Sequence, residues 1–318
     1  MISLPEQPLL SVVVPCYYNE LNLPDTYAVL LETEAQFPAG TRFEYIFVDD
    51  GSGDGTLHVL LDLHRRDPER VRVIKLSGNF GSHNALLAGL AHATGDCTVM
   101  LAADLQDPPE LIPRMFEHWQ RGIKLVVAHR QDREESLSQR LFSGAFHFLM
   151  RRYALRNVPP GGFDLMLFDR QLREELLQMR EKNTHLMYLL TWLRFESVII
   201  PYTRRKRDKG RSRWTLSKKI KLLIDSLVAF SFLPIRLIAL VGIVLGGLAL
   251  VYAAVIVVLK LSRWADIASG WSSLMVVLLL VSSFQMIALG IIGEYVWRAM
   301  DAARGRPPYV IDRVWEQK

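Results

Sequence analysis

Cysteine is scarce in this 318-residue sequence, which contains only two, Cys16 and Cys97. Both lie inside apolar, strand-like runs, so we interpret them as small core residues. This scarcity excludes a disulfide framework and a cysteine-rich zinc site. The first ten residues also lack the basic region of a secretory signal, and they contain Pro5 and Pro8. We therefore expect the N-terminal part of the chain to lie in the cytoplasm.

The familiar glycine-rich phosphate motifs are absent as well. No GxxxxGK[ST] pattern occurs anywhere in the sequence, which argues against a P-loop nucleotidase. The segment Gly51-Ser52-Gly53-Asp54-Gly55 reads GxGxG and lacks the third glycine of a dinucleotide fingerprint. A nicotinamide-dependent activity is accordingly disfavoured.

Two long runs near the C-terminus contain no charged residue, at positions 237–259 and 269–293. About 20 apolar residues suffice to cross a bilayer, so both runs are predicted to span a membrane, the alternative being a buried hairpin of a soluble protein. The net charge of +5 is concentrated before the first run, at positions 204–213. The positive-inside rule then predicts a multi-pass protein of the inner (cytoplasmic) membrane. Its hairpin loop (260–268) faces outward, and both termini lie in the cytoplasm.

The first 200 residues alternate short apolar strands with helical stretches, which predicts an α/β fold with a mostly parallel, doubly wound sheet. The expected strands are 9–14, 45–48, 71–76, 97–101 and 125–128, and the expected helices are 57–66, 84–93 and 111–121. Over residues 163–202 we expect a strand, then two short helices, and then a second strand. Residues 214–232 interleave lysines with apolar residues, as in a helix lying on an anionic membrane surface; packing on the soluble domain is the alternative.

The run 101–110 follows a predicted strand and carries Asp104 and Gln106 two residues apart. On an extended backbone these side chains project the same way. Their oxygen atoms suit Mg²⁺ or Mn²⁺ held against a substrate diphosphate. The alternative is a polar turn in which Pro108 and Pro109 start a helix.

Three further loops follow predicted strands, at 15–20, 49–56 and 78–84. They offer an aromatic side chain to stack on a base, carboxylates to accept hydrogen bonds from a base or ribose, and glycines that permit close backbone approach. Each alone is compatible with an ordinary turn. Together, on successive units of one sheet, they predict a nucleotide site.

The motifs VPCYYNE (14–20), VDDGS (48–52), NFG (79–81) and DLQDPPE (104–110), in this order, resemble glycosyltransferase family 2. With the two C-terminal runs, the chain resembles the polyprenyl-phosphate branch of that family, which includes dolichyl-phosphate mannose synthases and bactoprenol glucosyltransferases. The resemblance implies a metal-dependent enzyme with a GT-A fold and inversion at the anomeric carbon. It implies a GT-A domain with a basic arm (1–213), a juxtamembrane helix (214–232), a transmembrane hairpin (233–297) and a cytoplasmic tail (298–318).

The resemblance also assigns the site. Nucleoside binding falls to four positions, Pro15, Tyr17, Glu20 and Asp49 or Asp50, and metal binding to Asp104 and Gln106. The family usually has a further carboxylate two residues before Asp104, where this chain has Ala102. Without that carboxylate, the metal is expected to be bound by Asp104, Gln106 and the substrate diphosphate.

Basic residues are implied to bind the acceptor phosphate and the diphosphate: Arg130, Arg133, Arg140 and Ser143 after the fifth strand, and Arg207, Arg211, Ser212 and Arg213 in the arm. Arg211 and Asp164 are further catalytic candidates, Asp164 as a group that orients the sugar or acceptor. For the arm, attraction to anionic lipid is the alternative role. For Asp164, the alternative is an ordinary turn aspartate.

The expected partners are a nucleotide sugar, polyprenyl (undecaprenyl) phosphate and the bilayer, with no nucleic acid. UDP-glucose is favoured as donor only by likeness to bacterial members. Self-association into a homo-oligomer is left open. Two rival hypotheses are a processive polysaccharide synthase and a non-catalytic adaptor or lipid transporter with a degenerate transferase domain.

Overall fold

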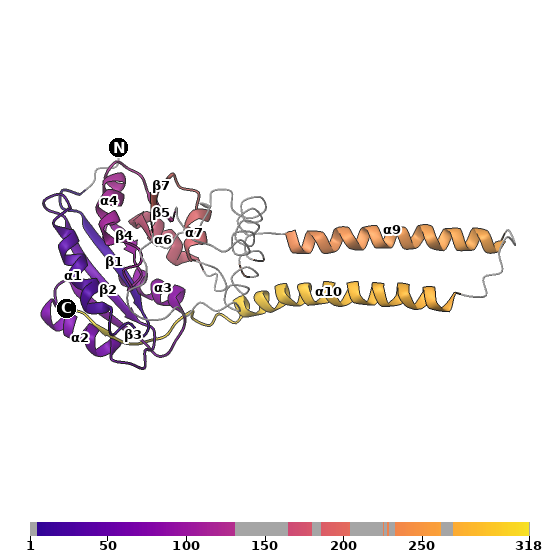
Figure 1. The fold of residues 1–318 in the computed structure, drawn as a ribbon, viewed down its shortest axis with the longest axis horizontal. Helices are drawn as coiled ribbons and strands as arrows, with labels where there is room; N and C mark the ends of the chain where they lie inside the picture. Colours follow the sequence, from indigo (N-terminus) through magenta and orange to yellow (C-terminus); the bar gives the residue numbers. More distant parts are fainter. Residues whose placement is uncertain are drawn as a thin grey trace. The chain divides into compact units, whose positions relative to one another are not determined.

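An eight-stranded sheet organises the N-terminal part of the protein in the computed structural model (Figure 1). The structure describes residues 5–130, 165–179, 186–203, 225, 228, 233–261 and 270–317. The strands of the sheet are β1 (Leu9–Cys16), β2 (Arg42–Asp49), β3 (Val71–Leu76), β4 (Cys97–Met100), β5 (Leu125–Arg130), β6 (Met166–Asp169), β7 (Ser197–Tyr202) and β8 (Ile311–Trp315). The helices in the described residues are α1 (Leu23–Glu34), α2 (Thr56–Arg66), α3 (Ser82–His92), the 3₁₀ turn η1 (Pro109–Leu111), α4 (Ile112–Gln120), α6 (Arg170–Gln178), α7 (Leu186–Trp192), α9 (Leu233–Leu261) and α10 (Trp271–Ala303).

The strand order is β7-β5-β6-β4-β1-β2-β3-β8. The four neighbouring strands β4, β1, β2 and β3 run parallel, as does the pair β5 and β7, whereas β6 and β8 run antiparallel to their neighbours. The predicted mostly parallel α/β sheet is therefore confirmed. All five strands predicted before residue 130 are present, because each is an apolar run buried on both faces.

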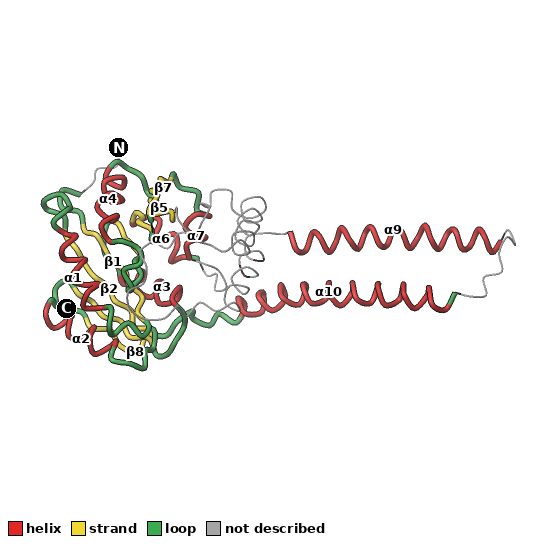
Figure 2. The backbone as a smooth tube through the Cα atoms, viewed as in Figure 1, coloured by secondary structure: helices red, strands yellow, loops and turns green. Residues whose placement is uncertain are grey.

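Helices cover both faces of this sheet, as Figure 2 shows. On one face, side chains of α1, α2 and α4 pack with alternate strand residues such as Val12 and Phe47. On the other face α3 approaches so closely that a Cβ on Gly89 would lie 2.4 Å from Val13 Cγ1. Glycine at this position therefore allows the helix to pack directly on β1 and β2.

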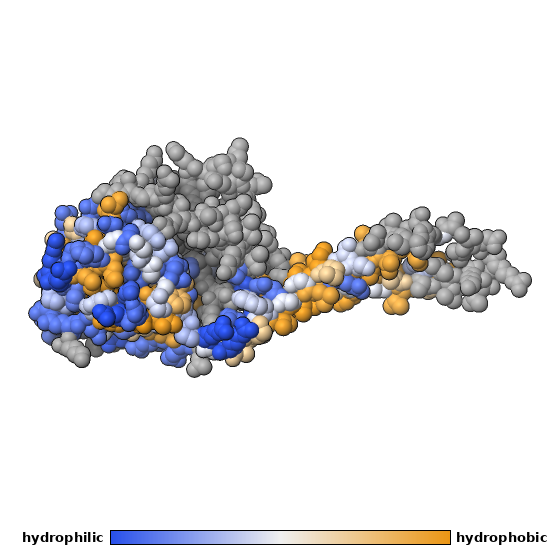
Figure 3. Space-filling view, turned by 90° about the horizontal axis from the view of Figure 1, so that it is seen from below, coloured by the Kyte–Doolittle hydropathy of each residue, from blue (hydrophilic) through white to orange (hydrophobic). Residues whose placement is uncertain are grey.

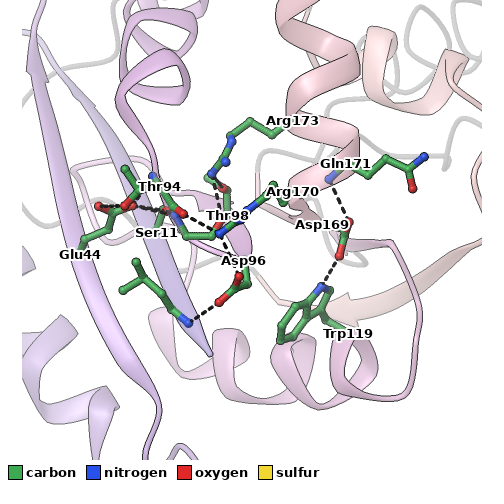
Figure 4. A network of polar contacts seen from close by, with 12 residues as sticks. Ser11, Glu44, Thr94, Asp96, Thr98, Trp119, Asp169, Arg170, Gln171 and Arg173 are labelled. Carbon is green, nitrogen blue, oxygen red and sulfur yellow. Dashed lines mark hydrogen bonds and ion pairs between the residues drawn. The ribbon is translucent and has the colours of Figure 1, made fainter. Parts of the chain in front are cut away.

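A polar network fixes the antiparallel β6 and the start of α6 to the amino-terminal ends of β1 and β4 (Figure 4). Arg170 Nη2 donates to Asp96 Oδ1 over 2.9 Å, and Trp119 Nε1 donates to Asp169 Oδ2 over 2.9 Å. Buried Glu44 accepts from Ser11 Oγ at 2.5 Å. This network lies at the sheet edge opposite to the loops predicted to bind nucleotide, so its role is to hold the sheet together.

The last strand, β8, was not predicted. The segment 298–318, expected as a separate tail, divides between the end of α10 and β8, which pairs antiparallel with β3. The chain accordingly divides into two compact units, one of residues 1–222 and 307–318 and the other of residues 223–306. The five-residue strand is short and carries charges, so its pairing with β3 could not be foreseen from hydropathy.

The second unit contains the two long helices α9 and α10, which are long and apolar enough to cross a membrane. Their most apolar windows, Ile235–Tyr252 and Leu280–Ala303, have no buried residues. Figure 3 shows hydrophobic residues along the described part of this helical hairpin. α9 extends beyond its predicted span (237–259) at both ends, whereas α10 begins two residues after the start of its predicted span (269–293) and ends ten residues after its end. Within the predicted juxtamembrane helix, the two described residues, Asp225 and Val228, are helical.

Candidate active site

The carboxyl ends of β1, β2 and β4 lie at one edge of the sheet, because β1 pairs in parallel with both neighbours. The chain proceeds from β1 to β2 on one side and returns to β4 on the other. This change of direction creates the position where open α/β sheets bind ligands. Three of the segments singled out in the sequence, 15–20, 49–56 and 101–110, leave the sheet here.

The loops after β1 and β2 are joined by hydrogen bonds. The amide of Tyr18 donates to Ser52 Oγ over 3.1 Å, and the amide of Gly55 donates to Glu20 Oε2 over 3.0 Å. Glu20 is exposed, so its carboxylate both ties down the β2 loop and faces solvent. Its predicted part in nucleoside binding stays a prediction.

Two tyrosines form the aromatic feature of the β1 loop. Tyr17 and Tyr18 meet edge to face with ring centroids 4.7 Å apart, and Tyr18 is 42% exposed. Tyr18 has a positive φ of 56°, and a Cβ on Gly53 would lie 2.7 Å from its hydroxyl oxygen. Gly53 therefore leaves room for the ring. Tyr17 was predicted to bind the nucleoside, and the more exposed Tyr18 is an additional surface on which a base can stack.

Asp49, the last residue of β2, is 1% exposed. Its Oδ1 accepts from the amide of Ser52 over 3.2 Å, whereas its Oδ2 is buried without a hydrogen-bond partner among the described residues. Burial raises the pKa of this carboxyl, against the opposing effect of the Ser52 hydrogen bonds. A buried acceptor of this kind requires a donor, and an N–H group of a nucleobase would supply one.

Asp50, unlike Asp49, has a hydrogen-bond partner for each of its carboxylate oxygens. Its Oδ1 accepts from the amide of Phe80 over 2.7 Å and its Oδ2 from the amide of Gly81 over 2.9 Å. Both carboxylate oxygens therefore tie the β2 loop to the loop after β3. Of the two aspartates that the sequence left as alternatives, this arrangement favours Asp49 for nucleoside binding and Asp50 for shaping the loop.

Asp104 and Gln106 lie in the loop after β4, and both are partly exposed. Asp104 Oδ1 accepts a hydrogen bond from the backbone N–H of Gln106 over 3.2 Å. Pro108 and Pro109 lead into η1 and α4, which is the polar turn that the sequence offered as the alternative. The expected extended backbone at Asp104 and Gln106 is wrong, because residues 103–107 form turns and bends and Leu105 has a positive φ. The two side chains therefore occur in a turn that opens a helix, at the same sheet edge as Asp49.

The residues of this loop fit a divalent cation that is completed by substrate. Asp104 and Gln106 offer one carboxylate and one amide oxygen, which are suitable for Mg²⁺ or Mn²⁺. Among the described residues no group of three or more His, Cys, Asp or Glu side chains is arranged to hold a metal. Substrate phosphates and water would thus complete the coordination, as is common for Mg²⁺.

Arg130, predicted to bind acceptor phosphate, is the last residue of β5 and is 7% exposed. It pairs in register with Tyr202 at the end of β7. The phosphate-binding role of Arg130 stays a prediction. Pro15 lies in β1 opposite Val48, next to the proposed nucleoside position. The other predicted site residues lie outside the described residues: Arg133, Arg140, Ser143, Asp164, Arg207, Arg211, Ser212 and Arg213.

Two residues that contact the loop after β4, and the part that Asp107 plays within it, were not predicted from the sequence. Thr26 of α1 donates to the carbonyl of Ala103 over 3.0 Å, and Tyr202 donates to Asp107 Oδ1 over 2.5 Å. Asp107 lies inside the DLQDPPE motif, but Thr26 and Tyr202 carry no local signal. Their partners are 77 and 95 residues away in the chain.

The chain is similar to known proteins over most of its length. The family model described as Glycosyl transferase family 2 matches residues 11–177. An uncharacterized glycosyltransferase of Bacillus subtilis is 36% identical over 95% of this chain and 93% of its own length. The undecaprenyl-phosphate 4-deoxy-4-formamido-L-arabinose transferase of Klebsiella pneumoniae is 32% identical over 100% of this chain and 97% of its own length. A prophage bactoprenol glucosyl transferase homolog of Escherichia coli is 32% identical over 96% of this chain and 99% of its own length.

Among solved structures, the glucosyl-3-phosphoglycerate synthase of Mycobacterium tuberculosis in complex with Mn²⁺, UDP and phosphoglyceric acid resembles this chain with a TM-score of 0.49. The likeness covers 70% of this chain and 78% of that one, at 20% sequence identity.

Proposed function

Because the chain belongs to glycosyltransferase family 2 and has the GT-A fold, we propose that it transfers glucose, with inversion, from UDP-glucose to undecaprenyl phosphate. The observation that carries this proposal is the likeness to polyprenyl-phosphate sugar transferases over the whole length. That likeness includes the two apolar helices as well as the sheet. The product would be a polyprenyl-phosphate sugar at the cytoplasmic face of the membrane.

The donor would bind across the loops that follow β1, β2 and β4. In this proposal the buried Oδ2 of Asp49 accepts a hydrogen bond from the base, and the Tyr17–Tyr18 pair packs against the nucleoside. Gly51, with a φ of +69°, lets the β2 loop pack on the backbone of Gly78, and Gly53 leaves room for the Tyr18 ring, so both glycines shape the loops around the ligand. The diphosphate would then extend toward the loop that carries Asp104 and Gln106.

The chemical step is a substitution at the anomeric carbon. An oxygen of the acceptor phosphate forms the new bond to that carbon, and the bond to the donor diphosphate breaks with its electron pair leaving on the nucleoside diphosphate. The acceptor phosphate is already anionic near neutral pH, since such groups have a second pKa of about 6. No strong general base is needed, and the task of the protein is to align the two phosphates.

Asp104 and Gln106 would hold Mg²⁺ or Mn²⁺, which when bound neutralises charge on the leaving diphosphate. The basic residues predicted in the arm, Arg207, Arg211 and Arg213 with Ser212, would contribute to the same end through bidentate contacts to phosphate oxygens. Arg133, Arg140 and Ser143 would receive the acceptor phosphate, and Asp164 would orient the sugar or the acceptor.

The membrane arrangement belongs to the same proposal. The catalytic domain and both termini would lie in the cytoplasm, with the connection between α9 and α10 outside. The pairing of β8 with β3 supports this topology, because the chain after α10 must return to the compartment that contains the sheet.

The test uses the full-length protein purified in detergent, with Mn²⁺ or Mg²⁺, undecaprenyl phosphate and a panel of radiolabelled nucleotide sugars. We expect label from UDP-glucose to enter the organic phase. Transfer from a different donor would retain the reaction and correct the sugar. A folded protein that transfers from no donor would contradict the proposal and favour a non-catalytic adaptor.

A further inference from the structure

The metal-binding loop contains a strained residue at its centre. Leu105 has a φ of +53°, in the left-handed region that a bulky side chain rarely adopts. It lies between Asp104 and Gln106, so its backbone conformation sets how these two side chains are presented. A conformation of this kind persists only where the surrounding structure fixes it.

On the amino-terminal side, the loop is fixed by a helix. Thr26 of α1 is fully buried, and its hydroxyl lies 3.0 Å from the carbonyl oxygen of Ala103 and 2.9 Å from that of Asn22. The contact to Asn22 lies within the same helical segment, whereas the contact to Ala103 crosses to the metal-binding loop. Thr26 therefore fixes the backbone two residues before Leu105.

On the carboxyl-terminal side, the loop is fixed by a strand. The Tyr202 hydroxyl, at the end of β7, donates to Asp107 Oδ1 over 2.5 Å, and both side chains are buried. Burial raises the pKa of Tyr202 further above its ordinary value, with the Asp107 charge adding to the effect and Arg130 opposing it. The hydroxyl thus keeps its proton, and the contact fixes the backbone two residues after Leu105.

We propose that Thr26 and Tyr202 are positioning residues that hold the strained 103–107 segment, and with it Asp104 and Gln106, in the arrangement that binds the cation. Neither residue touches substrate or cation in this proposal. The inference rests on the proposed function, because it takes the cation site from there. It adds two residues, from α1 and β7, that no motif identifies.

The first test compares Tyr202→Phe with Tyr45→Phe in the full-length protein. Tyr45 is a matched control, since its buried hydroxyl also donates to a carboxylate, Glu34 Oε1, over 2.6 Å, but far from the loop. The readout is Mn²⁺ binding in the presence of UDP, followed by electron paramagnetic resonance. We expect Tyr202→Phe to weaken Mn²⁺ binding about tenfold, as loss of a hydrogen bond to a charged group would, and Tyr45→Phe to leave it within about twofold.

The second test compares two threonines of the same helix. Thr26→Val removes the contact to Ala103, whereas Thr33→Val removes only a contact to the carbonyl of Val29 within α1. Weaker Mn²⁺ binding in Thr26→Val alone is the expected result. Because threonine and valine have similar shapes, both variants should fold.

Transfer activity separates positioning from a general loss of structure. For Tyr202→Phe and Thr26→Val, we expect the Mn²⁺ concentration for half-maximal transfer to rise and the rate at saturating Mn²⁺ to approach that of the unmodified protein. A loss of rate that excess Mn²⁺ does not restore, or wild-type Mn²⁺ affinity in both variants, would overturn the inference.

The proposed function can fail separately. An unmodified protein that binds Mn²⁺ with UDP but transfers no sugar to undecaprenyl phosphate would contradict the proposed reaction and leave the positioning result intact. An unmodified protein that binds no Mn²⁺ with either UDP or GDP would overturn both.

Discussion

Lys75 Nζ lies 2.6 Å from Asp312 Oδ2 and joins β3 to β8 across 237 residues of sequence. The pair is exposed, so its own contribution to stability is small, although Lys75 lowers the pKa of Asp312. Its significance is topological. The strand that follows both apolar helices belongs to the same sheet as the strands that precede them, as the proposed topology requires.

This relationship predicts which positions a membrane-impermeant thiol reagent can reach. Ser262→Cys, in the connection between the helices, should react in intact cells. Glu6→Cys and Gln317→Cys, both at exposed positions, should react only after the membrane is permeabilised. Mass shift of the purified protein measures the reaction.

The unmodified chain is the control for that experiment. Cys16 and Cys97 are fully buried, and burial raises the pKa of both thiols, so neither should react. Labelling of Gln317→Cys in intact cells would contradict the topology.

Asp49→Asn should weaken nucleotide binding without destabilising the protein. The substitution replaces one acceptor oxygen by a donor group at the position proposed to face the base, so we expect the Kd for UDP to rise at least about tenfold. Ser52 can still donate to the remaining oxygen, and a buried charge disappears. Calorimetric titration measures the affinity, and an unchanged Kd would remove Asp49 from the site.

Asp50→Asn should have a different effect. Both oxygens of Asp50 accept from backbone amides, so the amide group must leave Phe80 or Gly81 without its acceptor. We expect a loss of about 1–3 kcal/mol in the free energy of unfolding, measured by denaturant titration of the detergent-solubilised protein. Equal stability of the Asp49 and Asp50 variants would contradict the distinction between the two carboxylates.

The pH dependence of Asp49→Asn follows from the raised pKa of Asp49. A carboxyl whose pKa is higher in the folded than in the unfolded protein stabilises the fold fully below its unfolded pKa of about 3.8. That stabilisation is lost as pH rises through the folded value. The Tm of Asp49→Asn minus that of the unmodified protein should therefore be larger at pH 7 than at pH 4. A difference that shrinks toward pH 7 would show that the pKa is lowered instead.

Local patterns were sufficient to predict the central strands and the loops that follow them. β3 has the predicted bounds, and β1, β2, β4 and β5 differ by a few residues at their ends. Apolar runs buried on both faces leave little choice of structure. The polar residues at their carboxyl ends then converge because parallel strands end at the same sheet edge.

Long-range pairings could not be predicted in this way. β8 is short, and its pairing depends on the exposed edge of β3 rather than on its own hydropathy. The contacts of Thr26 and Tyr202 with the loop after β4 likewise depend on how α1 and β7 pack. The difference between Asp49 and Asp50 is one of hydrogen-bond partners, which two adjacent identical residues do not reveal in sequence.

The most direct test of the account is sugar transfer to undecaprenyl phosphate by the unmodified protein and by Asp104→Asn over a series of Mn²⁺ concentrations. Asp62→Asn, at a partly exposed position of α2 where the carboxylate pairs with Arg65, controls for loss of a carboxylate elsewhere. We predict that the unmodified protein and Asp62→Asn transfer label to the lipid. We also predict that Asp104→Asn, shown to be folded, loses at least about 100-fold in rate. A folded Asp104→Asn protein that transfers at the unmodified rate at every Mn²⁺ concentration would contradict the account.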